Sequence, residues 1–213
     1  GNVTVSGAQV TIDLTADFTD STDYYVQIDA TAFDDLAGNG YAGISDTTTW
    51  NFTTVDTTTP KVVTLSPADG ATGVGLTDNL AITFDEGMAK GSGDIVIYET
   101  GVGVFETIAV TAGNVTVSGA QVTIDPGTTF EDSTDYYVQI AASCFDDLAG
   151  NGYAGISDNT TWNFTTVDTT TPKVVSLSPA DDATGVGLTD NLVITFDEQI
   201  RRTEEPLRPI PPF

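Results

Sequence analysis

Hydrophobic and polar positions alternate along several short stretches of this chain. In Tyr136–Ile140 the first, third and fifth residues are apolar or aromatic, whereas the fourth, Gln139, is polar. Trp162 and Phe164 alternate with polar neighbours in the same way. A period of two residues is that of a half-buried β-strand, because successive side chains point to opposite faces. The pattern therefore predicts strands whose apolar faces form a core.

Strands of this kind follow one another at regular spacing, with Gly, Pro, Asn and Asp between them, and no convincing amphipathic helix is found. Short, evenly spaced strands are typical of an all-β sandwich. The predicted strands are Lys61–Leu65, Leu80–Phe84, Ile95–Glu99, Phe105–Val110, Val115–Val117, Gln121–Ile124, Tyr136–Ala141 and Thr161–Thr166.

The pattern repeats along the chain with a period of 112 residues. The stretch GNVTVSGAQVTID begins at Gly1 and again at Gly113, and TTTPKVV begins at Thr57 and again at Thr169. Residues 1–86 and 113–198 differ at 12 of 86 positions. A period of this length matches one sandwich domain, so the sequence predicts tandem Ig-like Greek-key β-sandwich repeats joined by short linkers.

The linkers are predicted at Val55–Lys61 and Val167–Lys173, where small polar residues and a proline separate two apolar runs. These linkers divide the chain into four parts. The parts are an N-terminal segment (residues 1–57, the C-terminal half of a repeat), a complete domain (residues 58–169), a C-terminal segment (residues 170–198, the start of a third repeat) and a non-repeat tail with Pro and Arg (residues 199–213).

Half of a sandwich cannot bury its apolar face or satisfy its strand edges, so both segments are expected to be aggregation-prone or disordered when left alone. One arrangement that covers them is complementation, in which strands within Lys173–Phe196 of one chain join residues 1–57 of another. This self-association is head to tail and extends into filaments. The pair lacks strands equivalent to Ile95–Val110, which weakens the arrangement.

The large excess of acidic over basic residues limits the classes of partner that the protein is expected to bind. The chain has 31 acidic and 6 basic residues and a formal net charge of −25, and its three arginines all lie in the tail. Without a basic patch, binding to nucleic acid or to an anionic membrane surface is not expected. No apolar run is long enough for a membrane span. Such a charge favours high-salt or calcium-rich surroundings, where cations screen the repulsion.

Catalytic arrangements are largely excluded by composition. The chain has no histidine and a single cysteine, Cys144, which we expect to be buried. Ser-His-Asp and Cys-His arrangements are therefore impossible, and zinc sites lose their common ligands. Paired acids such as Asp85 and Glu86 would need a sugar-binding cleft to act as a glycosidase. We predict that the protein is not an enzyme.

Several motifs in a fixed order carry a family resemblance. Tyr136, four residues after Asp132, resembles the tyrosine corner of Ig-like sandwiches. The order Ser66–Val74 (SPADGATGV), Ile82–Glu86 (ITFDE), Asp147–Asn151 (DLAGN) and Trp162–Thr166 (WNFTT) resembles the bacterial Ig-like domain of SbsA type. The resemblance covers the whole chain except the tail.

The resemblance implies a structural module of S-layer proteins, large adhesins and other multidomain secreted bacterial proteins, without catalytic residues. The expected function is therefore that of non-catalytic spacer repeats at the cell surface or outside the cell. The alternative is an adhesion or carbohydrate-binding accessory module, which needs exposed, coplanar aromatic rings. Its candidates are Trp50, Trp162, Tyr41 and Tyr153, and we expect the two tryptophans to be buried.

Calcium is the candidate cofactor, because hard cations take oxygen ligands from Asp, Asn and backbone carbonyls. The loop Asp146–Asn151 offers several such oxygens, although its spacing is not that of an EF-hand. Asp and Asn also favour turns by themselves, which is the competing explanation. The candidate ligands are Asp146, Asp147, Asn151 and Asp158, with Asp34, Asp35, Asn39 and Asp46 as their counterparts. A second hypothesis places calcium between domains, on Asp56, Asp85, Glu86 and Asp168.

Overall fold

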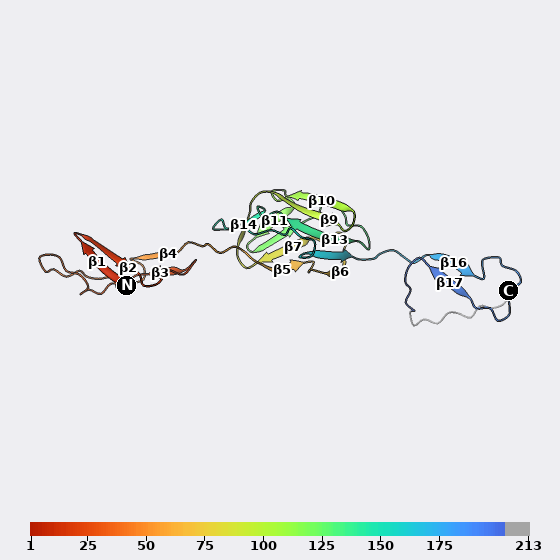
Figure 1. Cartoon of the computed structure of the whole chain (residues 1–213), viewed down its shortest axis with the longest axis horizontal. Helices are drawn as coiled ribbons and strands as arrows, with labels where there is room; N and C mark the ends of the chain where they lie inside the picture. Colours follow the sequence, from red (N-terminus) through yellow and green to blue (C-terminus); the bar gives the residue numbers. More distant parts are fainter. Residues whose placement is uncertain (203–213) are drawn as a thin grey trace. The chain divides into compact units, whose positions relative to one another are not determined.

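The computed structural model describes residues 1–202, and its regular elements there are all β-strands (Figure 1). The chain divides into two compact units, of which the first is Gly1–Val167 and the second begins at Asp168. Among the described residues there is no helix long and apolar enough to cross a membrane. The tail predicted for residues 199–213 lies outside the described residues from position 203 onward.

The complete domain is a sandwich of two sheets (Figure 1). One sheet has five strands in the order β10-β9-β13-β15-β6, and the other has four in the order β11-β12-β7-β5. The strands of the first sheet are β6 (Ala71–Val74), β9 (Asp94–Glu99), β10 (Gly103–Ala109), β13 (Asp135–Ile140) and β15 (Asn163–Thr166). Those of the second are β5 (Val62–Ser66), β7 (Leu80–Phe84), β11 (Val115–Ser118) and β12 (Gln121–Ile124).

Neighbouring strands in each sheet are often distant in the sequence. Strand β12 pairs with β7, and β13 pairs with β9, both antiparallel. The chain passes from one sheet to the other between β7 and β9, between β10 and β11, and between β12 and β13. Antiparallel strands joined by such crossings form the predicted Greek-key sandwich, so the prediction of an all-β Ig-like fold is confirmed.

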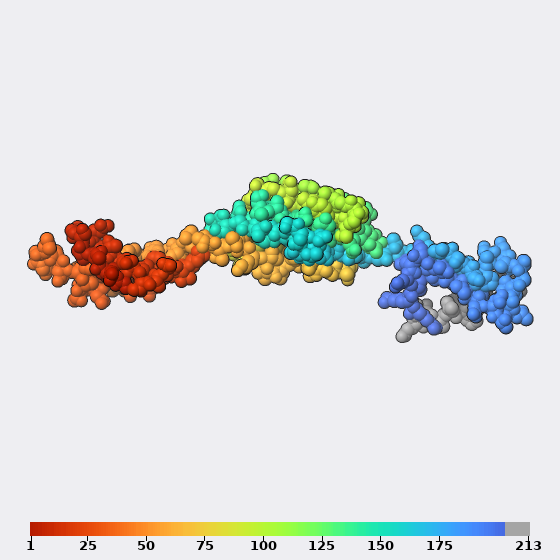
Figure 2. Space-filling view, in the orientation of Figure 1, coloured from red at the N-terminus to blue at the C-terminus, as the bar shows by residue number. Residues whose placement is uncertain are grey.

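The inner faces of the two sheets form one hydrophobic core. Tyr136, Val138 and Ile140 of β13 are buried, as their alternation predicts. Trp162 is also buried, and its indole N–H donates a hydrogen bond to the carbonyl of Pro67 (2.8 Å). Cys144 is free and buried. Figure 2 shows the complete domain, coloured from yellow through green to teal, as one continuous packed body.

The tyrosine corner is present in the complete domain. The backbone N–H of Glu131 donates to the hydroxyl oxygen of Tyr136 over 2.9 Å. The ring of Tyr136 packs against Phe130 and Phe164, with centroid distances of 4.9 and 5.8 Å. This contact fixes the loop before β13 to the core.

The pattern of hydrophobic and polar residues does not predict three strands of the complete domain. Strand β6 contains glycine and pairs parallel to β15, although Gly73 reads as a turn residue. Strands β8 (Met88–Lys90) and β14 (Phe145–Asp147) are short and pair only with each other. Asp146 and Asp147 therefore end a strand, whereas the sequence places them in a loop. Three residues are too few for a periodicity to be recognised.

The two segments repeat parts of the complete domain with unchanged pairing. The N-terminal segment contains two hairpins and the C-terminal segment contains one. Their strands are β1 (Asn2–Ser6), β2 (Gln9–Asp13), β3 (Asp23–Tyr25), β4 (Asn51–Thr53), β16 (Val174–Ser178) and β17 (Val193–Phe196). Val5 pairs with Val10, as Val117 pairs with Val122 in the complete domain. Both segments leave apolar side chains exposed.

Candidate metal centre

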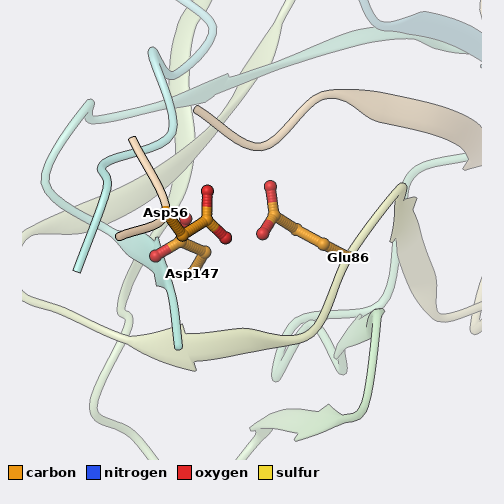
Figure 3. A group of neighbouring side chains, drawn as sticks. All are labelled: Asp56, Glu86 and Asp147. Atoms are coloured by element: carbon orange, nitrogen blue, oxygen red, sulfur yellow. The ribbon is translucent and has the colours of Figure 1, made fainter. Parts of the chain in front are cut away.

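Three acidic side chains from distant parts of the chain meet at the start of the complete domain (Figure 3). Asp56 lies on the linker before β5, Glu86 follows β7, and Asp147 is the last residue of β14. Each offers one carboxylate oxygen, and these three oxygens lie within 4.8 Å of one another. Asp147 is buried, while Asp56 and Glu86 are partly buried.

A backbone contact at Lys61 holds the linker beside the end of β7. The N–H of Lys61 donates to Oδ1 of Asp85 (2.8 Å), and the N–H of Asp85 donates to the carbonyl of Lys61 (3.0 Å). Asp85, predicted as a calcium ligand, thus has a structural partner, and Glu86 is left to face the other two carboxylates. The same pair of hydrogen bonds joins Lys173 and Asp197 in the third repeat.

Asp147 is held by the tight turn that follows it. Its Oδ1 accepts hydrogen bonds from the N–H groups of Ala149 and Asn151 (2.8 Å each), and its Oδ2 accepts one from the side-chain amide of Asn151 (2.8 Å). The same amide of Asn151 also donates to the carbonyl of Asp56 (3.2 Å). The DLAGN motif therefore positions Asp147 and binds the linker at the same time.

The electrostatics of the cluster are unfavourable to three negative charges. Partial burial raises the pKa of Glu86, and the charges of Asp147, Asp56 and Asp85 raise it further. Burial also acts to raise the pKa of Asp147, but the hydrogen bonds from Asn151 and Ala149 outweigh it, and the net shift is downward. The repulsion between the three negative charges therefore raises the pKa of Glu86 rather than that of Asp147.

The geometry of the three carboxylates suits a hard divalent cation. Calcium binds oxygen at about 2.3–2.6 Å, so two oxygens on one ion are at most about 5 Å apart. The spacing within 4.8 Å meets that limit. Three carboxylates without His or Cys are ligands for calcium or magnesium rather than zinc. Asp56, Glu86 and Asp147 are the residues that would hold the ion, and calcium binding stays a prediction.

The structure separates the other predicted ligands from this cluster. Asp158 accepts hydrogen bonds at Oδ1 from the N–H groups of Thr160 and Thr161 (2.8 and 2.7 Å), which is a turn contact. These bonds lower the pKa of Asp158 to about 2. Asp146 lies in β14 opposite Ala89, with an isolated bridge to Gly152. The contacts of Asp158 are those of a turn former, and metal binding by Asp158 and Asp146 stays a prediction.

The N-terminal segment repeats the turn contacts of the candidate ligands. Asp35 accepts from the N–H and the side-chain amide of Asn39 (2.8 and 2.7 Å), as Asp147 does from Asn151. Asp46 accepts a hydrogen bond from the hydroxyl of Thr49 (2.7 Å) and from the N–H groups of Thr48 and Thr49 (2.7 and 2.6 Å), and these contacts lower its pKa. Asp34 forms an isolated bridge with Gly40.

The sequence did not predict that Asp147 lies beside Asp56 and Glu86. The two calcium hypotheses assign Asp147 to one site and Asp56 and Glu86 to another, whereas the fold brings all three together. Their separation in the sequence hides the contact. One signal in the sequence is that all three acids recur at equivalent positions of another repeat. The counterparts of Asp147, Asp56 and Glu86 are Asp35, Asp168 and Glu198, respectively.

The four aromatic candidates for carbohydrate binding divide between the core and the surface, where Tyr41 is exposed. Trp162 and Tyr153 are buried in the core, as expected of the tryptophan. Trp50 is exposed, so the expectation that both tryptophans are buried is wrong for this residue. Residues 1–57 contain no counterpart of Pro67, whose carbonyl accepts the indole hydrogen bond of Trp162 in the complete domain.

Comparison with known proteins identifies the family of this chain. A family model described as bacterial Ig-like domain matches residues 1–54, 56–166 and 168–206. The chain therefore belongs to the bacterial Ig-like domain family. Domains of this family are generally non-catalytic and are common in surface or extracellular proteins. A comparison with curated proteins finds no match.

Proposed function

We propose that this chain forms non-catalytic structural repeats of a secreted or cell-surface bacterial protein, as spacers of an adhesin stalk or units of an S-layer-like array. The observation that carries the proposal is a closed sandwich core in residues 58–169 whose sequence recurs almost unchanged in the rest of the repeats. Because the repeats are nearly identical, they share the same strands, turns and linkers. A ligand-specific module needs only one copy of its site, whereas a spacer gains length from each added copy.

Each complete repeat has the properties of an independent structural unit. Its apolar side chains are buried inside one sandwich, so it does not depend on its neighbours for a core. In such an array the stability is a sum of domain terms and small interface terms. The net charge of −25 adds repulsion between neighbouring repeats and favours an extended arrangement over a collapsed one.

Assembly of several chains belongs to the same proposal. A surface array requires contacts between chains, and head-to-tail contact between the two incomplete segments is the arrangement that the sequence predicts. Calcium at the cluster of Asp56, Glu86 and Asp147 would join the linker to its own domain and reduce bending there. The contact between chains and the calcium site are additions to the structural function, and each needs a test of its own.

Small-angle X-ray scattering on chains of one, two and three complete repeats tests the proposal. We expect the maximum particle dimension to grow by a constant increment with each repeat, because independent domains on short linkers form an extended string. Chains of the same length in which the linker prolines Pro60 and Pro172 are replaced by Gly serve as a control for linker stiffness. A compact particle whose dimension hardly grows with repeat number would contradict the spacer function.

A further inference from the structure

The linker Val55–Lys61 is hydrogen-bonded along most of its length, although its composition is that of a flexible connection. Small polar residues such as its three threonines do not fix a conformation by themselves. The complete domain holds the end of the linker, because Pro60 is buried and Lys61 exchanges two hydrogen bonds with Asp85. Bending between two successive repeats is therefore left to residues 55–59.

The preceding repeat holds this part of the linker through the turn at Asp20. The two carboxylate oxygens of Asp20 accept hydrogen bonds from the N–H of Thr57 (3.0 and 3.1 Å) and from the hydroxyls of Thr57 (2.9 Å) and Thr58 (2.8 Å). These hydrogen bonds, that from the Thr58 hydroxyl first, lower the pKa of Asp20. Asp20 is therefore a charged acceptor, and such hydrogen bonds are stronger than those between neutral groups.

The complete domain holds the adjacent residue, Asp56. The side-chain amide of Asn151 donates to the carbonyl of Asp56 (3.2 Å) and to Oδ2 of Asp147 (2.8 Å). The N–H of Thr58 in turn donates to Oδ1 of Asp56 (3.1 Å). The contacts made by the two repeats thus fall on neighbouring linker residues, Asp56 and Thr57.

The turn at Asp20 recurs in the complete domain and faces the next linker there. Ser21 has a φ of 43° and its counterpart Ser133 has a φ of 50°. A positive φ is unfavourable for serine and persists where the surrounding contacts fix it. The N–H of Ser21 donates to the carbonyl of Val55, as that of Ser133 does to the carbonyl of Val167 (3.0 Å each). The turn therefore binds the following linker in both repeats.

We propose that the turn at Asp20 and the side-chain amide of Asn151 form a hydrogen-bonded joint, which orders the linker between successive repeats without a bound cation. The two groups belong to different repeats and bind adjacent residues, so bending within residues 55–58 requires at least one of them to let go. The joint uses the amide N–H groups of Asn151, which donate hydrogen bonds and do not bind cations.

The inference rests on the proposed structural function, to which it adds the contacts that stiffen the string. It can fail alone, because a string with flexible linkers also lengthens with each repeat. Conversely, compact multi-repeat particles in scattering would contradict the spacer function and leave the order of the linker untouched.

Backbone NMR relaxation of the 213-residue chain in excess EGTA tests the joint. We expect order parameters of about 0.85 at residues 56–58, the value of a rigid backbone, whereas a flexible linker lies below about 0.6. Asp20→Ala should lower the values at Thr57 and Thr58 below about 0.6. The control is Asp29→Ala, an acid of the same segment whose side chain makes no hydrogen bond to the linker in the described part of the chain, and it should change neither value.

Two further variants approach the joint from its other sides. Thr58→Val removes a donor to Asp20 and leaves the turn itself intact, and it should lower the order parameter of Thr58 as Asp20→Ala does. Asn151→Ala should lower that of Asp56, with Asn159→Ala as its control. Residues 1–57 and the complete domain should also tumble with one correlation time in the unsubstituted chain and with different ones in Asp20→Ala.

Three results would overturn the proposal. The first is an order parameter below about 0.6 at residues 56–58 of the unsubstituted chain in EGTA, including the case in which calcium raises it, because the ion would then order the linker. The second is unchanged order and tumbling in Asp20→Ala. The third is a loss of order in Asp20→Ala that Thr58→Val does not share, which would assign the loss to damage of the turn.

Discussion

Residues 1–57 and 113–169 have nearly the same sequence and very different surroundings. Trp162 is completely buried, whereas Trp50, at the equivalent position, is 43% exposed. Both regions keep the same hairpins, and in both a tyrosine hydroxyl accepts a backbone hydrogen bond, Tyr136 from Glu131 and Tyr24 from Thr19. Local structure thus follows the sequence in both places, whereas burial depends on strands supplied from elsewhere.

The comparison shows which interactions of the domain are local. Turn contacts such as Asp35 with Asn39 and Asp147 with Asn151 form with or without a core around them. The burial of an apolar side chain, by contrast, needs both sheets. Stability should therefore respond very differently to the same substitution at equivalent positions.

The largest expected effect is that of Trp162→Ala in the complete domain. Removing a buried Trp costs about 3–5 kcal/mol of unfolding free energy, since it leaves a cavity, and here it also leaves the Pro67 carbonyl without its donor. Trp50→Ala should cost less, because Trp50 is already 43% exposed. Urea unfolding followed by circular dichroism measures both. Equal effects at the two positions would show that residues 1–57 have a core after all.

The second prediction concerns the acidic cluster, which combines Asp56 of the linker with Glu86 and Asp147 of the complete domain. A cation bound by the folded state alone stabilises it by about 2.7 kcal/mol when its free concentration is about 100 times Kd. We expect calcium to raise the melting temperature of the 213-residue chain, and excess EGTA to reverse the rise. If calcium does not change the melting temperature, the prediction of a calcium site is wrong and these acids act as turn formers.

The variant Glu86→Gln sharpens this test. The folded-state pKa of Glu86 is raised, so without calcium its contribution to stability is lost as the pH rises through that pKa. Removing the charge should therefore raise the melting temperature in EGTA and reduce the response to calcium. Asp125→Asn, which removes one charge away from the cluster, is the matched control. A full calcium response in Glu86→Gln would place any bound ion elsewhere.

The smallest expected effect is that of Asp158. Its pKa is lowered from 3.8 to about 2, first by the backbone hydrogen bond from Thr160, so its contribution is present above pH 4 and is lost as the pH falls through 2. Asp158→Asn should remove this part of the acid sensitivity. Denaturant midpoints between pH 2 and 5 measure it, with Asp46→Asn as the equivalent change outside the complete domain. A steeper pH dependence in Asp158→Asn would contradict the assignment.

Much of the fold was predictable because the signals are short-range. All eight predicted strands are present, since alternation and turn residues act over a few positions. Strands β6, β8 and β14 were missed because they are short, or contain glycine, and exist through pairing with distant partners. The cluster was only half predicted for the same reason: Asp147 reaches Asp56 and Glu86 through β14, a strand that sequence periodicity does not reveal.

The sequence by itself determined the repeat period, the longer strands, the turns and the family, because these depend on neighbouring residues and on identity between copies. Only the tertiary structure decided which apolar residues are buried and which acids lie together. Burial and charge proximity arise from contacts between residues far apart in the chain, and the same local sequence accepts either outcome. Val10 and Val122 differ in this respect alone.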